Sequence, residues 1–486
     1  MKKNNRFPIA SGYGGMDVTL TGDLLRYDGI DKLISQTFED KIFYIDYDLP
    51  LYEAAIITSL SPKGVILAFG GKNYHPLIFF KDALIPCIAG VGYVDFKTKF
   101  IVMDCENGSI YASDDYIKLK PYTINKTSIS NVYANIGSER ALEVAYETGA
   151  KGIGILRTEF IIVRALADCI NLEIKPNLSV KEMVLNSNEA DVIYELVQIE
   201  TYAILFKDYL KKIIQKAVRF FKNKPVIIRS IDIERHDNDP MGYRGIRRCI
   251  AENGGVFRII IQAIKEIIWE TNANNIAIIY PLVSDYSQIK YATEYIKNIG
   301  LQFWNEQDKN FIKIGWKIEQ PASVINNKVW IEAFKEDFGL YPHFLGIGTN
   351  DLTQFTLSVS RNVEMSNNSI QAKEYINSLY NEKDYSILFQ LSHLMLSIRN
   401  TNIEVILHGE IGSDSSLLKY LCLLNIRISM TAYKIAELSV RLEEIMQKEL
   451  DLQQVIEEVV NGFPFSANIK QVMINELVNN IVKQLK

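Results

Sequence analysis

Eight short apolar runs rich in β-branched residues recur after residue 128, and most are separated by longer stretches with helical periodicity. This alternation of buried strands and crossover helices is the pattern of a parallel sheet. The runs cover residues 130–137, 152–159, 225–232, 276–283, 312–319, 344–351, 404–411 and 426–430. Eight such strands over about three hundred residues match a (β/α)8 TIM barrel of the α/β class. A doubly wound sheet is the competing interpretation.

Polar residues at the ends of these runs favour the barrel. In a barrel the carboxyl ends of the strands meet at one mouth, where the active site lies. The residues at or just after the end of a run are Arg157, Arg229, Glu319, Asn350, Asp351 and His408. A barrel would bring them into one candidate site, although each alone would equally suit the start of a polar loop.

The charges in this set suit a substrate that carries both phosphate and carboxylate. Glu319 and Asp351 end neighbouring runs, and paired carboxylates are common ligands of Mg²⁺. Arg157 and Arg229 have planar guanidinium groups, which bind phosphate or carboxylate through two hydrogen bonds. Further arginines follow at Arg244, Arg247 and Arg361. The alternative is that these acids and arginines simply pair with one another.

The two ends of the chain have other patterns. Residues 1–120 contain shorter strands, turns rich in Gly, Pro and Asp, and a helix-like run before residue 40. They predict a small separate domain, joined to the barrel by a polar linker at 114–130. Beyond residue 436, helical spacing and alternating charges predict helices that cap the barrel or pair with a second chain. The predicted strands near the N-terminus are 41–47, 64–69, 100–104 and 108–112, and the predicted domains are 1–120, 121–436 and 437–486.

A second chemical feature is His75, in the segment GGKNYHPLIFFKDALIPCIAGV. The paired glycines before it and Pro76 after it predict a turn that presents the imidazole at the start of a helix. A neutral imidazole is a nucleophile toward phosphorus, whereas a lone histidine is more often a packed or surface residue. No GxxxxGK[ST] or GxGxxG motif occurs, so ATP use would need another chain.

Composition excludes several classes of protein. The formal charge is −5, from 53 Lys+Arg and 58 Asp+Glu, which argues against binding nucleic acid through its phosphates. Five scattered cysteines without a CxxC pair suit a reducing compartment. Apolar stretches are interrupted by charge well short of the ~20 residues that span a bilayer, and no signal-peptide core follows the N-terminus. We expect a soluble, cytoplasmic protein that does not enter the membrane.

Five motifs resemble those of the phosphoenolpyruvate (PEP)-utilising enzymes, the family of PEP synthase, pyruvate phosphate dikinase and enzyme I of the sugar phosphotransferase system. In chain order they are GIGILRTEF, VIIRSID, DPMGYRGIRR, IEQP and GIGTNDLTQFTLSVSR. The resemblance covers about residues 45–436, and DPMGYRG resembles the synthase branch most. It implies a PEP-binding TIM barrel preceded by a swivelling phosphohistidine domain.

The resemblance also implies roles for single residues. Glu319 and Asp351 would hold Mg²⁺, and His75 would carry the phosphoryl group to the enolate of pyruvate. The substrate-binding set would be Arg157, Arg229, Arg244, Asn350 and Arg361. His408 aligns with the family's cysteine that protonates the enolate carbon. With an ordinary pKa of about 6.5 against about 8.5 for cysteine, His408 would be a substitute acid, a mark of changed specificity or a mark of lost activity.

The sequence therefore predicts a Mg²⁺-dependent phosphotransferase of the PEP synthase type, which passes phosphate between a phosphohistidine and pyruvate or PEP. The family's ATP-grasp domain has no counterpart in the sequence, so we expect a split enzyme with a separate ATP-grasp subunit. The resemblance also implies a homodimer. The alternative is a catalytically impaired relative that binds PEP in a regulatory or partner-binding role. An enzyme I is a third interpretation, disfavoured because the chain lacks room for the helical carrier-binding domain.

Overall fold

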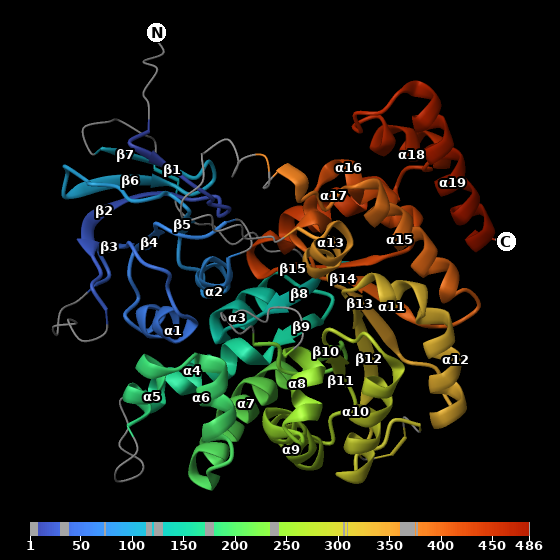
Figure 1. The fold of residues 1–486 in the computed structure, drawn as a ribbon, viewed down its shortest axis with the longest axis horizontal. Coiled ribbons are helices and arrows are strands. Elements are labelled where there is room, and N and C mark those ends of the chain that lie inside the picture. Colours follow the sequence, from blue (N-terminus) through green and yellow to red (C-terminus); the bar gives the residue numbers. More distant parts are fainter. Residues whose placement is uncertain are drawn as a thin grey trace. The chain divides into compact units, whose positions relative to one another are not determined.

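The computed structural model describes most of the chain, and the chain divides into two compact units (Figure 1). Unit 1 comprises Met1–Ile124, Gly137–Ala141 and Ile162–Ile193, and unit 2 comprises Asn125–Ile136, Leu142–Ile161 and Tyr194–Lys486. The described residues are 8–29, 38–71, 74–112, 119–120, 130–170, 179–233, 243–304, 307–308, 310–359, 375 and 378–485. The predicted division at residues 120 and 436 stays a prediction, and most of the predicted linker lies outside the described residues.

Unit 1 contains a seven-stranded mixed sheet in the order β1-β7-β6-β2-β3-β4-β5. Strands β2 to β5 pair in parallel, and the pairs β2–β6, β6–β7 and β1–β7 are antiparallel. Helices α1 (Leu51–Ser59) and α2 (His75–Asp82) follow β3 and β4. The strands are β1 (Ala10–Ser11), β2 (Thr19–Arg26), β3 (Lys41–Ile45), β4 (Gly64–Leu67), β5 (Cys87–Ala89), β6 (Phe100–Asp104) and β7 (Ser109–Ala112).

The strands predicted near the N-terminus are confirmed, whereas most of the helix-like run before residue 40 lies outside the described residues. Thr19–Arg26, which the sequence did not single out as a strand, forms strand β2, because its backbone is hydrogen-bonded to β3 on one side and to β6 on the other. Residues 30–37 lie outside the described residues.

Unit 2 is built around a closed barrel of eight parallel strands in the order β10-β11-β12-β13-β14-β15-β8-β9. Each of the eight predicted runs overlaps one strand, so the TIM barrel is confirmed and the doubly wound sheet is wrong. The strands are β8 (Tyr133–Ile136), β9 (Ile153–Arg157), β10 (Val226–Arg229), β11 (Ile276–Tyr280), β12 (Lys313–Ile318), β13 (Phe344–Ile347), β14 (Glu404–Leu407) and β15 (Arg427–Thr431).

The barrel closes where the last strand meets the first, and we call this β15–β8 pairing the closing seam. Ser429 lies opposite Tyr133 in the parallel register. Across the closing seam, the Ser429 hydroxyl donates to Asn135 Oδ1 at 2.6 Å, and Asn135 Nδ2 donates to the Ser429 carbonyl at 3.2 Å. The Tyr133 hydroxyl also donates to Glu404 at the amino-terminal end of the barrel, at 3.0 Å. These buried polar contacts fix the register of strands that are far apart in sequence.

Helices surround the barrel (Figure 1), and many begin at an acidic or hydroxyl cap that the sequence supplies. The helices predicted beyond residue 436 are confirmed as α17, α18 and α19. The helices after α2 are α3 (Glu139–Glu147), α4 (Thr158–Ile170), α5 (Val180–Asn186), α6 (Glu189–Leu196), α7 (Glu200–Phe220), α8 (Gly245–Ala251), α9 (Gly255–Thr271), α10 (Tyr286–Asn298), α11 (Pro321–Ile325), α12 (Asn327–Phe338), α13 (Thr349–Leu357), α15 (Tyr385–Ser397), α16 (Ser415–Leu423), α17 (Ile435–Met446), α18 (Leu452–Val460) and α19 (Ala467–Leu485).

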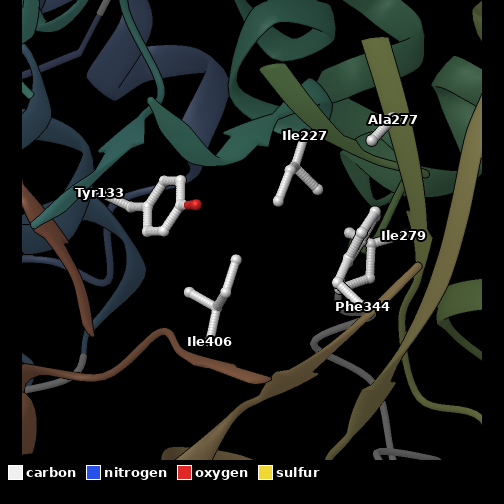
Figure 2. Packing of buried hydrophobic residues seen from close by; sticks show 6 residues of the cluster. All are labelled: Tyr133, Ile227, Ala277, Ile279, Phe344 and Ile406. Atoms are coloured by element: carbon white, nitrogen blue, oxygen red, sulfur yellow. The ribbon is translucent and has the colours of Figure 1, made fainter. Parts of the chain in front are cut away.

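The interior of the barrel is filled by buried side chains that we call the apolar plug (Figure 2). They come from five different strands, and none is more than 5% exposed. The plug residues are Tyr133, Ile227, Ala277, Ile279, Phe344 and Ile406. Because the plug packs the interior, a ligand of this barrel can bind only at its mouth. Among the described helices, none is long and apolar enough to cross a membrane.

Candidate active site

The layer above the apolar plug is polar, because side chains two residues apart on a strand face the same side. On β10, Ile227 of the plug is followed by Arg229, and at the end of β14, Ile406 is followed by His408. On β12 the same alternation places Lys317 and Glu319 on one face. The carboxyl ends of three strands thus present charged or titratable groups to the mouth.

Two of the predicted arginines lie in one buried network of ion pairs. Arg244 donates to both carboxylate oxygens of Asp232, each at 3.0 Å. Its Nη1 atom also lies 3.4 Å from Asp351 Oδ1. Arg229 lies 3.3 Å from Asp232 through Nη1 and contacts Glu159 through Nη2. The structure therefore brings Arg229, Arg244 and Asp351 together, and it does so through the acid–arginine pairing that the sequence left open.

Burial and opposite charge compete within this network. Burial raises the pKa of Glu159, and the neighbouring guanidinium of Arg229 acts against that rise. Burial alone would lower the pKa of Arg229, but the carboxylates of Glu159 and Asp232 outweigh it and raise this pKa. Arg229 is therefore charged at neutral pH, and it pairs with Glu159 and Asp232.

The Lys317–Glu319 pair lies on the face of β12 that lines the barrel. Lys317 Nζ lies 2.8 Å from Glu319 Oε1, and the two side chains are 3% and 1% exposed. The second oxygen of Glu319, Oε2, accepts a hydrogen bond from the backbone N–H of Leu282 at 2.9 Å. Gly348 makes room for the pair, since a Cβ atom there would lie 2.4 Å from Glu319 Oε1 and 2.9 Å from Lys317 Nζ. Both oxygens of Glu319 are therefore engaged.

This arrangement tests the predicted Mg²⁺ site. Mg²⁺ binds carboxylate oxygens at about 2.0–2.1 Å. On Glu319 Oε1 it would lie about 4 Å from the Lys317 ammonium, where a double and a single charge repel by about 8 kcal/mol at an effective dielectric constant of about 20. In the described part of the chain, no three His, Cys, Asp or Glu side chains gather as a metal site. The residues as arranged do not fit a Mg²⁺ ion bound to Glu319.

His408 directly follows strand β14, and its ring turns into the barrel. Its Nε2 atom lies 2.9 Å from the carbonyl oxygen of Gly154. A carbonyl oxygen only accepts hydrogen bonds, so Nε2 carries the proton and Nδ1 is the acceptor. Nδ1 has no hydrogen-bond partner among the described residues. Gly346 leaves space for the ring, since a Cβ atom there would lie 2.7 Å from His408 Cε1.

The charge state of His408 follows from its surroundings. Burial lowers the pKa of the imidazole well below its ordinary value, and the positive charge of Lys317 lowers it further. The Gly154 carbonyl acts in the opposite direction but does not compensate. At neutral pH His408 is therefore uncharged, with its one N–H directed at Gly154.

Two further predicted barrel residues, Arg157 and Asn350, lie at the rim of the mouth. Arg157 is the last residue of β9, and its guanidinium lies over the ring of Phe160 at 5.4 Å. Asn350 and Asp351 lie in the first turn of α13 rather than on a strand, because β13 ends at Ile347. With its amide nitrogen facing Glu382, Asn350 donates to both carboxylate oxygens, at 3.1 and 3.2 Å. Arg361 lies outside the described residues.

His75 belongs to unit 1, where it is the first residue of α2. The residue before it is anchored: the Tyr74 hydroxyl donates to Asp48 and accepts a hydrogen bond from the backbone N–H of Leu49 at 2.9 Å. Gly70, with φ +97°, brings the backbone against the Tyr74 ring, where a Cβ atom would lie only 2.3 Å away. The helix therefore starts at His75 as predicted, whereas residues 72–73 of the predicted turn lie outside the described residues, and the imidazole is partly exposed.

Comparison with known proteins identifies the family. A family model described as the PEP-binding domain of PEP-utilising enzymes matches residues 112–447, which is more than half of the chain. The chain belongs to the PEP-utilising enzyme family. The PEP synthase of Pyrococcus furiosus is 26% identical over 387 residues, which cover 74% of this chain and 41% of that protein.

This member of the PEP-utilising enzymes is also similar to two other proteins. The PEP-protein phosphotransferase of Buchnera aphidicola is 24% identical over 450 residues, which cover 84% of this chain and 68% of that protein. A Haloferax volcanii malate synthase structure with lead(II) covers 57% of this chain and 75% of its own, with 10% identity and a TM-score of 0.30. The chain spans about two-fifths of the length of the synthases that it matches.

The family match contains every barrel residue discussed above, whereas His75 precedes it. Sequence reasoning missed four residues of this PEP-utilising barrel. Three of them carried a signal, because they stand within three positions of a predicted residue: Glu159 and Asp232 follow Arg157 and Arg229, and Lys317 precedes Glu319. Glu382 lies in no recognised motif, and only the fold brings it to Asn350. The missed residues are Glu159, Asp232, Lys317 and Glu382.

Proposed function

We propose that the barrel mouth binds PEP and pyruvate, and that a phosphoryl group passes between PEP and His75. The observation that carries the proposal is the buried network in which Arg229 and Arg244 are held by carboxylates above the closed plug. Arg229, fixed in this way, has a buried Nε–H without a partner among the described residues, and a guanidinium group suits phosphate or carboxylate oxygens. The membership of the PEP-utilising family supports the same substrate.

The transfer to His75 exchanges one bond to phosphorus for another. A ring nitrogen of neutral His75 attacks phosphorus, the N–P bond forms, and the bond between phosphorus and the enol oxygen breaks. The enolate that leaves takes up a proton at carbon to become pyruvate. His408 is uncharged and its one N–H points at Gly154, so we assign this proton to water. We expect protonation at carbon to be slow for that reason.

We give Mg²⁺ no step in this reaction. The sequence predicts Mg²⁺ on Glu319 and Asp351, and a Mg²⁺ ion bridging substrate oxygens would neutralise charge during transfer. Against it stand the pairs that Glu319 makes with Lys317 and that Asp351 makes with Arg244. A separate ATP-grasp subunit, a homodimer and a cytoplasmic location are further parts of the proposal, each inferred from the family and from composition.

The experiment is incubation of the full chain with PEP, followed by mass spectrometry for acid-labile phosphate. We expect one phosphate on His75, none in His75→Ala, and an unchanged signal in His393→Ala, which removes an exposed histidine of α15. Phosphate that persists in His75→Ala would contradict the assignment of the carrier. Arg229→Lys should reduce the signal without removing it, because the charge remains and the planar fork is lost.

A second function has one specific observation in its favour. An uncharged His408 with a committed N–H is a poor acid for the enolate, which favours a relative that binds PEP without completing turnover. Such a protein would bind PEP in calorimetry and show no phosphate on His75. Calorimetry and the phosphorylation assay on one preparation therefore separate the two functions.

A further inference from the structure

Lys317 gives this barrel a fixed positive charge at the depth of its acidic residues. Its side chain lies on the same face of β12 as Glu319, and only 3% of the side chain is exposed. Glu319 is its partner among the described residues, at 2.8 Å. An ammonium group has three N–H donors, so two remain for other acceptors inside the mouth.

The space around Lys317 is built for a long cationic side chain. Gly346 of β13 and Gly348, directly after the strand, lie two residues apart, and a Cβ atom at either position would overlap the polar layer. At Gly348 it would meet the Lys317–Glu319 pair, and at Gly346 it would meet the ring of His408. The two glycines therefore accommodate the ammonium and the imidazole together.

From this geometry we infer that the Lys317 ammonium takes the place of a divalent cation, so that the barrel binds PEP without Mg²⁺. The inference rests on the proposed binding of PEP at the mouth. The ligand class is a small anion in which a carboxylate stands next to an enol, phosphate or second carboxylate oxygen, and oxalate is the simplest member. Such an anion would accept from the free N–H donors of Lys317 and from the fork of Arg229.

Charge balance supports this assignment. A buried carboxylate needs a compensating charge, and a metal ion would supply it to Glu319 only while bound. The Lys317 ammonium supplies it from within the same strand, and the hydrogen bond from Leu282 completes the partners of Glu319. A divalent ion added to this pair would be repelled by the ammonium group. It is also not needed to compensate the charge of Glu319.

The first test measures PEP and oxalate binding to the full chain by calorimetry, after treatment with EDTA and again with excess Mg²⁺. We expect the dissociation constants in the two conditions to agree within about threefold. Binding that requires Mg²⁺ would overturn the inference while leaving the proposed function intact. Absence of PEP binding in both conditions would instead contradict the proposed function, and the second test then decides the inference alone.

The second test uses Mn²⁺ alone, detected by electron paramagnetic resonance, and needs no substrate. Wild type should leave Mn²⁺ free, whereas Lys317→Met, which keeps the length of the side chain and removes its charge, should bind about one ion. Lys313→Met makes the same change at the start of β12 and should behave as wild type. Uptake of Mn²⁺ by wild type, abolished by Glu319→Gln, would overturn the inference.

Folding of the variant is controlled separately. Lys317→Met leaves Glu319 buried without its partner, and such a change can unfold a barrel. The double variant Lys317→Met with Glu319→Gln removes both charges and should fold and leave Mn²⁺ free. If this double variant still binds the ion, Glu319 is not the ligand that Lys317 protects, and the inference is wrong.

Discussion

His408 shows how burial sets the chemistry of a single side chain. The imidazole lies between the Gly154 carbonyl and the face of Gly346, and Lys317 adds a positive charge nearby. Burial and that charge both disfavour the imidazolium form, so the ring stays neutral when the protein is folded. In the unfolded chain the same ring would take up a proton near its ordinary pKa of about 6.5.

This difference predicts a pH dependence of stability. The folded pKa of His408 is depressed, so stability is lost as the pH falls below about 6.5, by up to about 1.4 kcal/mol per pH unit. His408→Gln, whose amide nitrogen reaches the Gly154 carbonyl, should lose less stability than wild type between about pH 7.5 and about pH 5.5. Urea unfolding of both proteins at the two pH values measures this loss of stability. His393→Gln, at an exposed histidine, is the control. Parallel losses in wild type and His408→Gln would contradict the assignment.

A second prediction concerns Asp232, which holds Arg244 through both oxygens and also contacts Arg229. Asp232→Asn leaves two buried cations without this carboxylate and should cost about 3–5 kcal/mol. The exposed ion pair of Asp337 with Lys290 is the matched comparison, and Asp337→Asn should cost at most about 1 kcal/mol. Equal changes in the urea midpoint of both variants would show that the Asp232 network is not structural.

The limits of sequence reasoning at this scale are visible in Lys317 and Asp232. Lys317 stands inside a predicted strand run and Asp232 inside a motif that the sequence singled out, but a residue's partner depends on which strand lies beside it. Lys317 and Glu319 share a face through the simple alternation of a strand, which sequence alone supplies. Arg244 contacts Asp232 and Asp351 because the fold brings these residues together. No local sequence pattern encodes those contacts.

At the scale of elements, the barrel strands were predictable because each is a short apolar run buried on both faces. Strand β2 was not, since only one of its residues is fully buried and its pairing partners, β3 and β6, come later in the chain. The ends of elements were also less predictable. The run 344–351 contains the end of β13 and the first turn of α13, so Asn350 and Asp351 lie on a helix.

Strand β13 yields a prediction of its own. Gly346→Ala would place a methyl group 2.6 Å from Ile279 Cδ1 and 2.7 Å from the His408 ring, so neighbouring side chains must shift. We expect a loss of about 1–3 kcal/mol, the usual cost of overpacking. Gly462→Ala is the matched control, because its new methyl group would approach nothing closer than 3.6 Å. Thermal unfolding of the two variants measures the difference, and an unaffected Gly346→Ala would show that the ring is not held there.

At the scale of the whole molecule, the homodimer stays a prediction, and a measurement of the molecular mass in solution can test it. Light scattering should give about twice the chain mass of 55.5 kDa. Ile469 and Val472 of α19 expose apolar side chains, 49% and 55%, three residues apart on one helical face. We expect the double change to glutamate at these positions to yield a monomer, whereas Val440→Glu on α17 should leave the dimer. A wild-type mass of one chain would contradict the prediction.

The closing seam has a consequence for the synthesis of the protein. Strand β8 is made early, and its partner β15 ends at Thr431, so the sheet cannot close until nearly three hundred further residues have been translated. Until then two strand edges with unpaired backbone groups stay available to other chains. A nascent chain of this protein is therefore most prone to aggregate just before residues 427–431 leave the ribosome, and chaperone demand should fall once Ser429 reaches Asn135.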